Sequence, residues 1–168
     1  KTKFGAHVIA LGEGKFDVVL LQKGLPGGPK DSSWDGKTKV MLKGETKDGV
    51  VELSGTNFKG TIKDGVLSGT AEENVKYEGK KVERKSETLG AKPPAGAIVL
   101  FDGTNVDAWQ NGKIQEGNLL GVGTRTKQKF EDFTLHLEFR TPFMPKARGQ
   151  GRGNSGMYLV DQYECQIL

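Results

Sequence analysis

The sequence contains few of the residues on which many small folds and enzymes depend: one cysteine, two histidines and six prolines in 168 positions. The lone Cys165 excludes an intramolecular disulfide framework and any metal site built from several cysteines of this chain. Neither His7 nor His136 lies next to a nucleophile-elbow motif, so a Ser–His–Asp triad is not indicated. No run approaches the roughly 18 apolar residues of a membrane helix, and we expect no membrane span.

The chain also lacks a strong excess of one charge. Its formal net charge is +4, and most basic residues alternate with acidic ones, which predicts a solvated surface and no nucleic-acid partner. Binding of a polyanion by the lysine-rich N-terminal half is the alternative. The segment Gly151–Gly156 matches GxGxxG, but it precedes an expected strand, whereas a dinucleotide site needs a helix N-terminus there.

Glycine, in contrast, is abundant, with 25 residues. Several glycines follow an aspartate or asparagine between short runs of alternating apolar residues. Such dipeptides favour type I′ hairpin turns, because both central residues of that turn have positive φ. The dipeptides in question are Asp35-Gly36, Asp48-Gly49, Asp64-Gly65, Asp102-Gly103 and Asn111-Gly112.

These patterns predict an all-β chain without a long amphipathic helix. We expect an antiparallel meander module at residues 1–85, a linker at 86–96 that contains Pro93-Pro94, and a second β-rich part at 97–168. The strands expected in the meander are His7–Leu11, Phe16–Leu21, Lys39–Lys43, Val50–Ser54, Phe58–Lys63, Val66–Ala71 and Asn74–Arg84. Those expected in the second part are Ala97–Phe101, Phe133–Arg140, Gly156–Val160 and Tyr163–Leu168.

The expected strand Phe133–Arg140 has two different faces, because side chains alternate along a strand. One face is apolar, with Phe133, Leu135, Leu137 and Phe139; the other carries Thr134, His136, Glu138 and Arg140. The polar row suits a ligand-facing sheet, and a plain solvent face explains it equally well. The last expected strand places Glu164 and Gln166 together on one face.

A mixed histidine–carboxylate metal site is one interpretation of these polar faces. His136 and Glu138 lie two positions apart on one strand face, and Glu164 is expected to lie across from them. Nitrogen and oxygen donors of this kind suit several divalent metal ions. No other cofactor is indicated.

Three stretches carry a family resemblance, and they occur in order from residue 98 onward. They read LFDGTNVDAW (Leu100–Trp109), FEDFTLHLEFR (Phe130–Arg140) and GRGNSGMYLVDQYECQIL (Gly151–Leu168). Together they resemble the 3-keto-disaccharide hydrolase domain family. The module that precedes them is similar to the leader of planctomycete-like members of that family.

The resemblance implies a concanavalin-A-like β-sandwich, or jelly roll, whose concave face binds carbohydrate. It also implies cleavage of glycosides that are oxidised at C3 of the sugar. There the ketone acidifies the C2 proton, so that elimination of the aglycone and subsequent hydration become feasible. A non-catalytic module for glycan binding or assembly on the same fold is the alternative. A periplasmic or secreted location is a further expectation from the resemblance.

The resemblance also implies roles for individual residues. Glu138 or Glu164 would be the base or a metal ligand, and His136 a metal ligand or an acid. Arg140 and Arg152 would hold sugar or keto oxygens, and Asn154 and Gln166 would donate hydrogen bonds. For Asn154, a role in a strand-initiating turn stays open.

The family pattern runs on beyond the final YECQIL of this sequence. The residues that carry the resemblance supply about half of a two-sheet sandwich, which needs both sheets to cover its core. The resemblance therefore implies that a second polypeptide segment completes the sandwich and covers the apolar side chains of Phe133, Leu135, Met157 and Ile167. That segment is either another chain, such as the C-terminal piece of a nicked precursor, or a continuation not included in this sequence.

Overall fold

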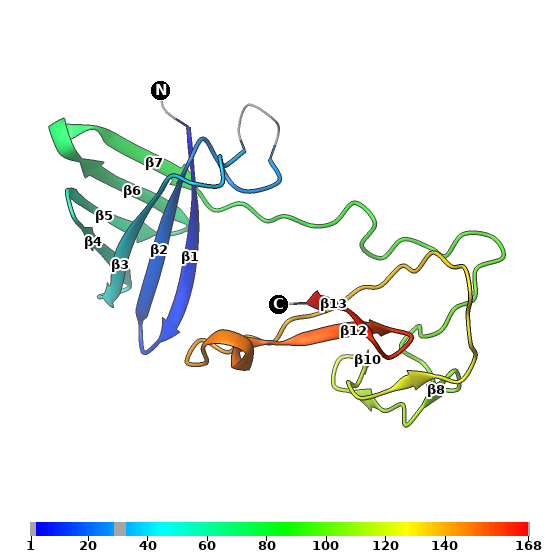
Figure 1. Ribbon diagram of the computed structural model, residues 1–168. Helices are drawn as coiled ribbons and strands as arrows, with labels where there is room; N and C mark the ends of the chain where they lie inside the picture. Colours follow the sequence, from blue (N-terminus) through cyan, green and yellow to red (C-terminus); the bar gives the residue numbers. More distant parts are fainter. Residues whose placement is uncertain (1–2, 29–32, 168) are drawn as a thin grey trace. The chain divides into compact units, whose positions relative to one another are not determined.

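A computed structural model describes residues 3–28 and 33–167 of the chain (Figure 1). The chain forms two compact units. The first unit comprises residues 1–84 and 142–154, and the second comprises residues 85–141 and 155–168. The prediction of an all-β chain that begins with an antiparallel meander is confirmed.

The first unit contains one seven-stranded sheet, in which each strand pairs antiparallel with the next along the chain. Five of the seven predicted strands differ from the observed bounds by no more than three residues at either end. The third strand is four residues longer than predicted. The last begins two residues later, because Glu72–Asn74 form a 3-10 turn before it, and it ends four residues earlier. The strands are β1 (Phe4–Gly12), β2 (Lys15–Gln22), β3 (Lys39–Lys47), β4 (Val50–Gly55), β5 (Phe58–Lys63), β6 (Val66–Ala71) and β7 (Lys76–Lys80).

The φ angles of the aspartate–glycine and asparagine–glycine dipeptides show which of them form the predicted type I′ turns. At Asp48-Gly49 and Asp64-Gly65 both residues have positive φ, as a type I′ turn requires. At Asp35-Gly36 and Asp102-Gly103 only the glycine does, so the prediction is wrong there. Each of these two aspartates instead accepts a hydrogen bond from the backbone N–H two residues on, which forms an Asx turn. At Asn111-Gly112 only the asparagine has positive φ.

The sheet curls until β1 contacts β7 (Figure 1). There the rings of Phe4 and Tyr77 meet edge to face, with centroids 5.5 Å apart. Alternate residues of each strand point to the inside of the curl and form its core. The buried members of this core are Val18, Leu20, Leu42, Leu53, Phe58 and Leu67. Burial of each such side chain is worth roughly 1.5–3 kcal/mol.

Two core positions are glycines for a steric reason. Gly60 and Gly69 are opposite each other on β5 and β6, and the Phe58 ring lies over both. A Cβ at position 69 would lie 2.8 Å from Cζ of Phe58, and one at position 60 would lie 3.0 Å from Cε1. The glycine content of the meander therefore also makes room for an aromatic ring, besides forming turns.

The second unit contains three short two-stranded ladders. β8 (Trp109–Gln110) pairs with β11 (Arg125–Thr126), and β9 (Ile114–Gln115) pairs with β10 (Leu119–Leu120). The longest ladder joins β12 (Ser155–Leu159) to β13 (Tyr163–Ile167). This hairpin was predicted to within one residue at each observed end, and position 168 of the predicted strand lies outside the described residues.

The predicted strands at Ala97–Phe101 and Phe133–Arg140 are not present in the described part of the chain. The apolar side chains of the second segment are exposed instead, by between 42% at Leu135 and 62% at Phe139. A strand depends on backbone hydrogen bonds to a neighbour, and alternation of side chains does not supply that neighbour.

The buried apolar side chains of residues 3–28 and 33–167 all belong to the first unit. Within those ranges, the second unit exposes large apolar residues such as Ile98, Val122 and Phe133 and buries none fully. Over the same residues, no helix has the length and apolar character needed to cross a bilayer.

Candidate functional site

His136 and Glu138 form a side-chain pair on the extended segment that precedes Pro142. Two residues apart, they lie on the same side of the chain, and His136 Nε2 is 3.2 Å from Glu138 Oε1. The two side chains are 54% and 40% exposed. At this exposure an ion pair contributes little stability, so the importance of the contact lies in orienting the imidazole.

A backbone amide holds the Glu138 carboxylate from another segment. Gly90 N–H donates a hydrogen bond to Oε1 of Glu138, with N and O 2.5 Å apart. This bond, and next the hydrogen bond with His136, lower the pKa of Glu138 from its usual value. Glu138 is therefore ionised at neutral pH and acts as a hydrogen-bond acceptor, whereas a proton held on it is disfavoured.

Arg140 follows Glu138 by two residues on this segment. Its Nη2 donates a hydrogen bond to the carbonyl of Glu116, with N and O 3.4 Å apart. The guanidinium lies beside Gly117, where an added Cβ would be 3.1 Å from Nη1. Since a guanidinium has five donors, this single long bond leaves Arg140 able to bind a further oxygen.

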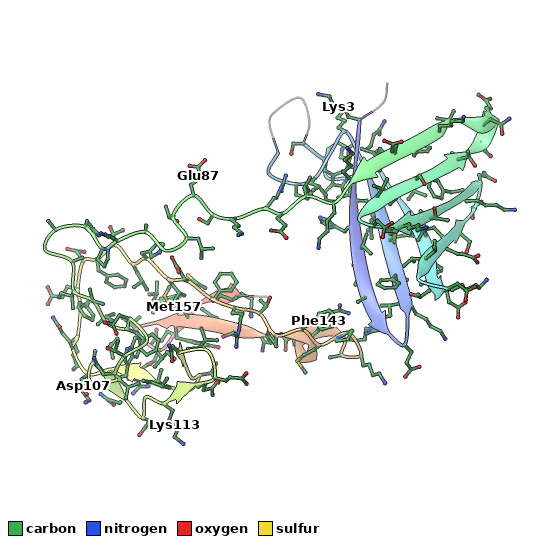
Figure 2. All side chains as sticks on the ribbon, turned by 180° about the vertical axis from the view of Figure 1, so that it is seen from behind. Lys3, Glu87, Asp107, Lys113, Phe143 and Met157 are labelled. Atoms are coloured by element: carbon green, nitrogen blue, oxygen red, sulfur yellow. The ribbon has the colours of Figure 1, made fainter. Side chains whose placement is uncertain are left out.

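Glu164 and Gln166 lie on the β12–β13 hairpin. The register places Glu164 opposite Tyr158, and Gln166 opposite Gly156, so these four residues share one face. The side-chain amide of Gln166 donates to the carbonyl of Ser155 at 2.8 Å. The carboxylate of Glu164 raises the pKa of Tyr158 through a hydrogen bond and through its charge. Met157, labelled in Figure 2, lies on the same strand and belongs to the opposite, apolar face.

The two remaining predicted site residues belong to the first unit. Arg152 Nη2 donates to the carbonyl of Ala10 at 2.8 Å, and its Nη1 lies 3.4 Å from the carbonyl of Pro145. Asn154 is exposed, and its backbone N–H donates to Gln150 at 3.1 Å. The predicted sugar-binding set is thus divided between the two units.

The metal interpretation needs three donors in one place. Among residues 3–28 and 33–167, no group of three histidine, cysteine or acidic side chains lies close enough to hold one ion. His136 and Glu138 are together, and Glu164 pairs with Tyr158 instead. The arrangement does not fit the predicted three-residue metal site, and we derive no chemistry from a metal.

Comparison with known proteins gives a match for the part of the chain that contains the predicted site residues. Residues 96–168 match the family model of the 3-keto-alpha-glucoside-1,2-lyase-like domain. The match covers the three stretches that carry the resemblance, so the predicted resemblance of this part of the chain to that family is confirmed. No curated protein and no solved structure matches the chain.

The matched region contains one functional candidate that the sequence patterns had not identified. Tyr158 follows from the hairpin register, since counting back from the turn places it opposite Glu164. Outside the matched residues, the Gly90 amide had also not been identified. It lies 48 positions from Glu138, and nothing in its local sequence indicates the contact.

A groove on the first unit is relevant to the alternative that the lysine-rich N-terminal half binds a polyanion. It has a volume of about 650 Å³, and its lining includes Lys15, Lys43, Lys47 and Lys59. Two of these lysines have acidic partners at 2.6 Å: Lys43 pairs with Asp17, and Lys47 pairs with Glu52. Local pairing of this kind is typical of a solvated surface.

Proposed function

We propose that the lyase-like domain cleaves glycosides carrying a ketone at C3 of the sugar, with His136 as the proton acceptor. The contact between His136 and Glu138 carries this proposal. The description of the matched family supports it, because a 1,2-lyase eliminates a group across C1 and C2 of a 3-keto-α-glucoside.

His136 is suited to remove the C2 proton. With Nε2–H donating to Glu138, Nδ1 carries the free electron pair of the neutral ring. An ionised Glu138 also stabilises the imidazolium that forms when Nδ1 takes the proton. Imidazole is the side chain that takes up and releases protons near neutral pH.

The proposed reaction conserves atoms and electrons. His136 takes the C2 proton, which the C3 ketone acidifies, and the electron pair of the C2–H bond forms the C1=C2 double bond. The C1–O bond to the aglycone breaks, and the departing oxygen takes a proton from water. The hydroxide left by that water then adds to C1, and C2 regains its proton from His136, so that one water molecule is consumed in total. Arg140, four residues after His136 and with unused donors, donates hydrogen bonds to the keto oxygen.

Release of p-nitrophenol from p-nitrophenyl 3-keto-α-glucoside by the full chain tests the proposal. We expect turnover above the enzyme-free blank, unchanged by a chelator. His136→Asn should lower kcat/KM by about 10²- to 10⁴-fold, the usual contribution of general acid–base catalysis. His7→Asn is the matched control, since His7 is exposed on β1 of the other unit, and it should leave the rate unchanged. No release above the blank, or full activity of His136→Asn, would contradict the proposal.

Glycan binding without catalysis is the second candidate, and the exposure of the central pair favours it. His136 and Glu138 are about half exposed, whereas enzymes commonly enclose their reacting groups and exclude water. Saturable binding of the 3-keto-glucoside without any release of p-nitrophenol would favour this candidate.

We further propose that β-strands of a second polypeptide segment cover the apolar row of Phe133, Leu135, Leu137 and Phe139. The segment is extended, its apolar side chains are exposed, and its backbone has no strand partner within the described residues. Only another backbone can supply both the hydrogen bonds and the apolar surface that such a segment needs. A monomeric chain that unfolds cooperatively as a whole would contradict this proposal.

We also propose that the protein is located outside the cytoplasm. The resemblance to the matched family supports this location.

A further inference from the structure

One face of the β12–β13 hairpin combines an exposed aromatic ring with polar side chains. Its members are Gly156 and Tyr158 on β12, and Glu164 and Gln166 on β13. Tyr158 is 58% exposed and lies directly opposite Glu164. The other face is apolar and includes Met157, Leu159 and Ile167. The polar face is therefore distinct from the surface that a second segment would cover.

The missing side chain at Gly156 determines where the carboxylate of Glu164 lies. A Cβ built at position 156 would be only 2.7 Å from Cδ and from Cγ of Glu164. The Glu164 side chain thus lies flat across the glycine instead of pointing away from the hairpin. Any larger residue at position 156 would have to displace this side chain, because real Cβ contacts are not that short.

Tyr158 and Glu164 present two complementary surfaces side by side. A pyranose ring has C–H groups on its faces and hydroxyl groups at its edge. An exposed aromatic ring can pack against the C–H face, and an adjacent carboxylate can accept hydrogen bonds from two hydroxyls. The tyrosine hydroxyl interacts with Glu164, which fixes the ring beside the carboxylate.

We propose that Tyr158 and Glu164 form a pyranose-binding pair, in which Tyr158 packs against the sugar ring and Glu164, placed by Gly156, accepts its hydroxyls. The inference rests on the proposed function for the choice of a sugar as ligand. It adds the residue that binds the ring, which is separate from the residues that transfer protons.

Binding of methyl α-D-glucopyranoside to the full chain, followed by NMR, tests this pair without any turnover, because that sugar has no ketone. Tyr158→Ala should weaken binding at least tenfold, and Tyr158→Phe, which keeps the ring, should weaken it less. Tyr163→Ala is the matched control, since Tyr163 is 67% exposed on the same hairpin but belongs to the other face. It should leave the affinity unchanged.

Gly156→Ala tests whether sugar binding depends on the position of the Glu164 side chain, since this variant keeps Glu164 but displaces its carboxylate. It should weaken binding as much as Glu164→Gln, although alanine itself removes no group that touches the sugar. Backbone amide spectra of each variant show whether the hairpin is intact. Equal effects of Tyr158→Ala and Tyr163→Ala, or no saturable binding by the wild-type chain, would overturn the pair. The chain could bind the sugar through Tyr158 and yet release no p-nitrophenol. That result would support the pyranose-binding pair and contradict only the proposed cleavage reaction.

Discussion

The guanidinium of Arg152 donates a hydrogen bond to the backbone carbonyl of Ala10, with Nη2 and O 2.8 Å apart. The two residues are 142 positions apart in the sequence. Lys146 adds a second long-range contact, an ion pair in which its Nζ lies 2.8 Å from Oε1 of Glu13 in the β1–β2 turn. Residues 142–154 therefore belong structurally to the first unit, although the lyase-like domain match includes them.

Removal of the Arg152 contact should loosen the loop it holds. A hydrogen bond to a charged donor contributes about 1.5–3 kcal/mol net, which corresponds to about a ten- to hundredfold change in a local opening equilibrium. We expect Arg152→Ala to increase amide hydrogen exchange over residues 146–153 by that factor. The sheet of the first unit should keep its protection.

Arg148→Ala is the control for this experiment. Arg148 donates to the carbonyls of Pro145 and Ala147, so its contacts stay within the loop. Its removal should have a smaller effect on exchange than that of Arg152. Equal effects of the two variants would mean that the contact with Ala10 does not hold the loop.

The core glycines make a separate prediction about stability. Gly69→Ala places a methyl group 2.8 Å from the ring of Phe58 and 2.6 Å from the carbonyl of Lys59. Overpacking of this kind costs typically about 1–3 kcal/mol. Urea unfolding of the first unit should reveal a lower midpoint, and the additional change Phe58→Leu should recover part of the loss.

Gly151→Ala is matched to this change. No atom lies within 4 Å of a Cβ at position 151, and its φ is not in the left-handed region. We expect its unfolding free energy to stay within about 0.5 kcal/mol of the wild type. A loss at position 151 as large as that at position 69 would mean that ring packing is not the cause.

A third prediction concerns Trp109, the last residue of the LFDGTNVDAW stretch. Trp109 Nε1–H donates to the carbonyl of Leu100 at 2.7 Å and closes the loop between them. Trp109→Phe keeps most of the ring but removes this donor. Amide exchange over residues 101–108 should increase several-fold, since a typical intramolecular hydrogen bond contributes about 1 kcal/mol. Trp34→Phe, which removes a similar but exposed bond from Trp34 Nε1–H to the carbonyl of Thr38, should leave residues 101–108 unchanged.

The meander could be predicted because its information is local. Strands β5 and β6 were predicted with their observed bounds, since an aspartate–glycine pair with positive φ lies between them and apolar residues alternate on both sides. The same reasoning failed at Phe133–Arg140, where the alternation is equally regular. Pairing there depends on a neighbouring backbone, which a local pattern does not contain.

The candidate site was predictable in part for the same reason. The pairing of His136 with Glu138 follows from their spacing of two, and the shared face of Glu164 and Gln166 from strand alternation. The contact of Arg152 with Ala10 spans most of the chain, and no spacing rule reaches across that distance. Arg152 was predicted to hold sugar oxygens, and that role stays a prediction. In the structure its guanidinium already donates to the carbonyls of Ala10 and Pro145.

The hydrogen bond from Gly90 to Glu138 predicts a pH dependence with a definite sign. The pKa of Glu138 is lowered in the folded chain, so the unfolded chain binds the proton more readily. The stabilisation is therefore fully present above the ordinary glutamate pKa of about 4.3 and is lost as the pH falls through the lower folded value. In a 15N titration, the Gly90 amide should shift with a midpoint below the ordinary glutamate value.

Glu138→Gln provides the control, because an amide oxygen still accepts from Gly90 but does not titrate. Its Gly90 amide should keep one chemical shift across the same acidic range. His136→Asn should move the midpoint only slightly upward, since the Gly90 bond is the larger cause of the lowered pKa. A midpoint at or above the ordinary value in the wild-type chain would show that Gly90 does not hold this carboxylate, and the orientation of His136 by Glu138 would lose its support.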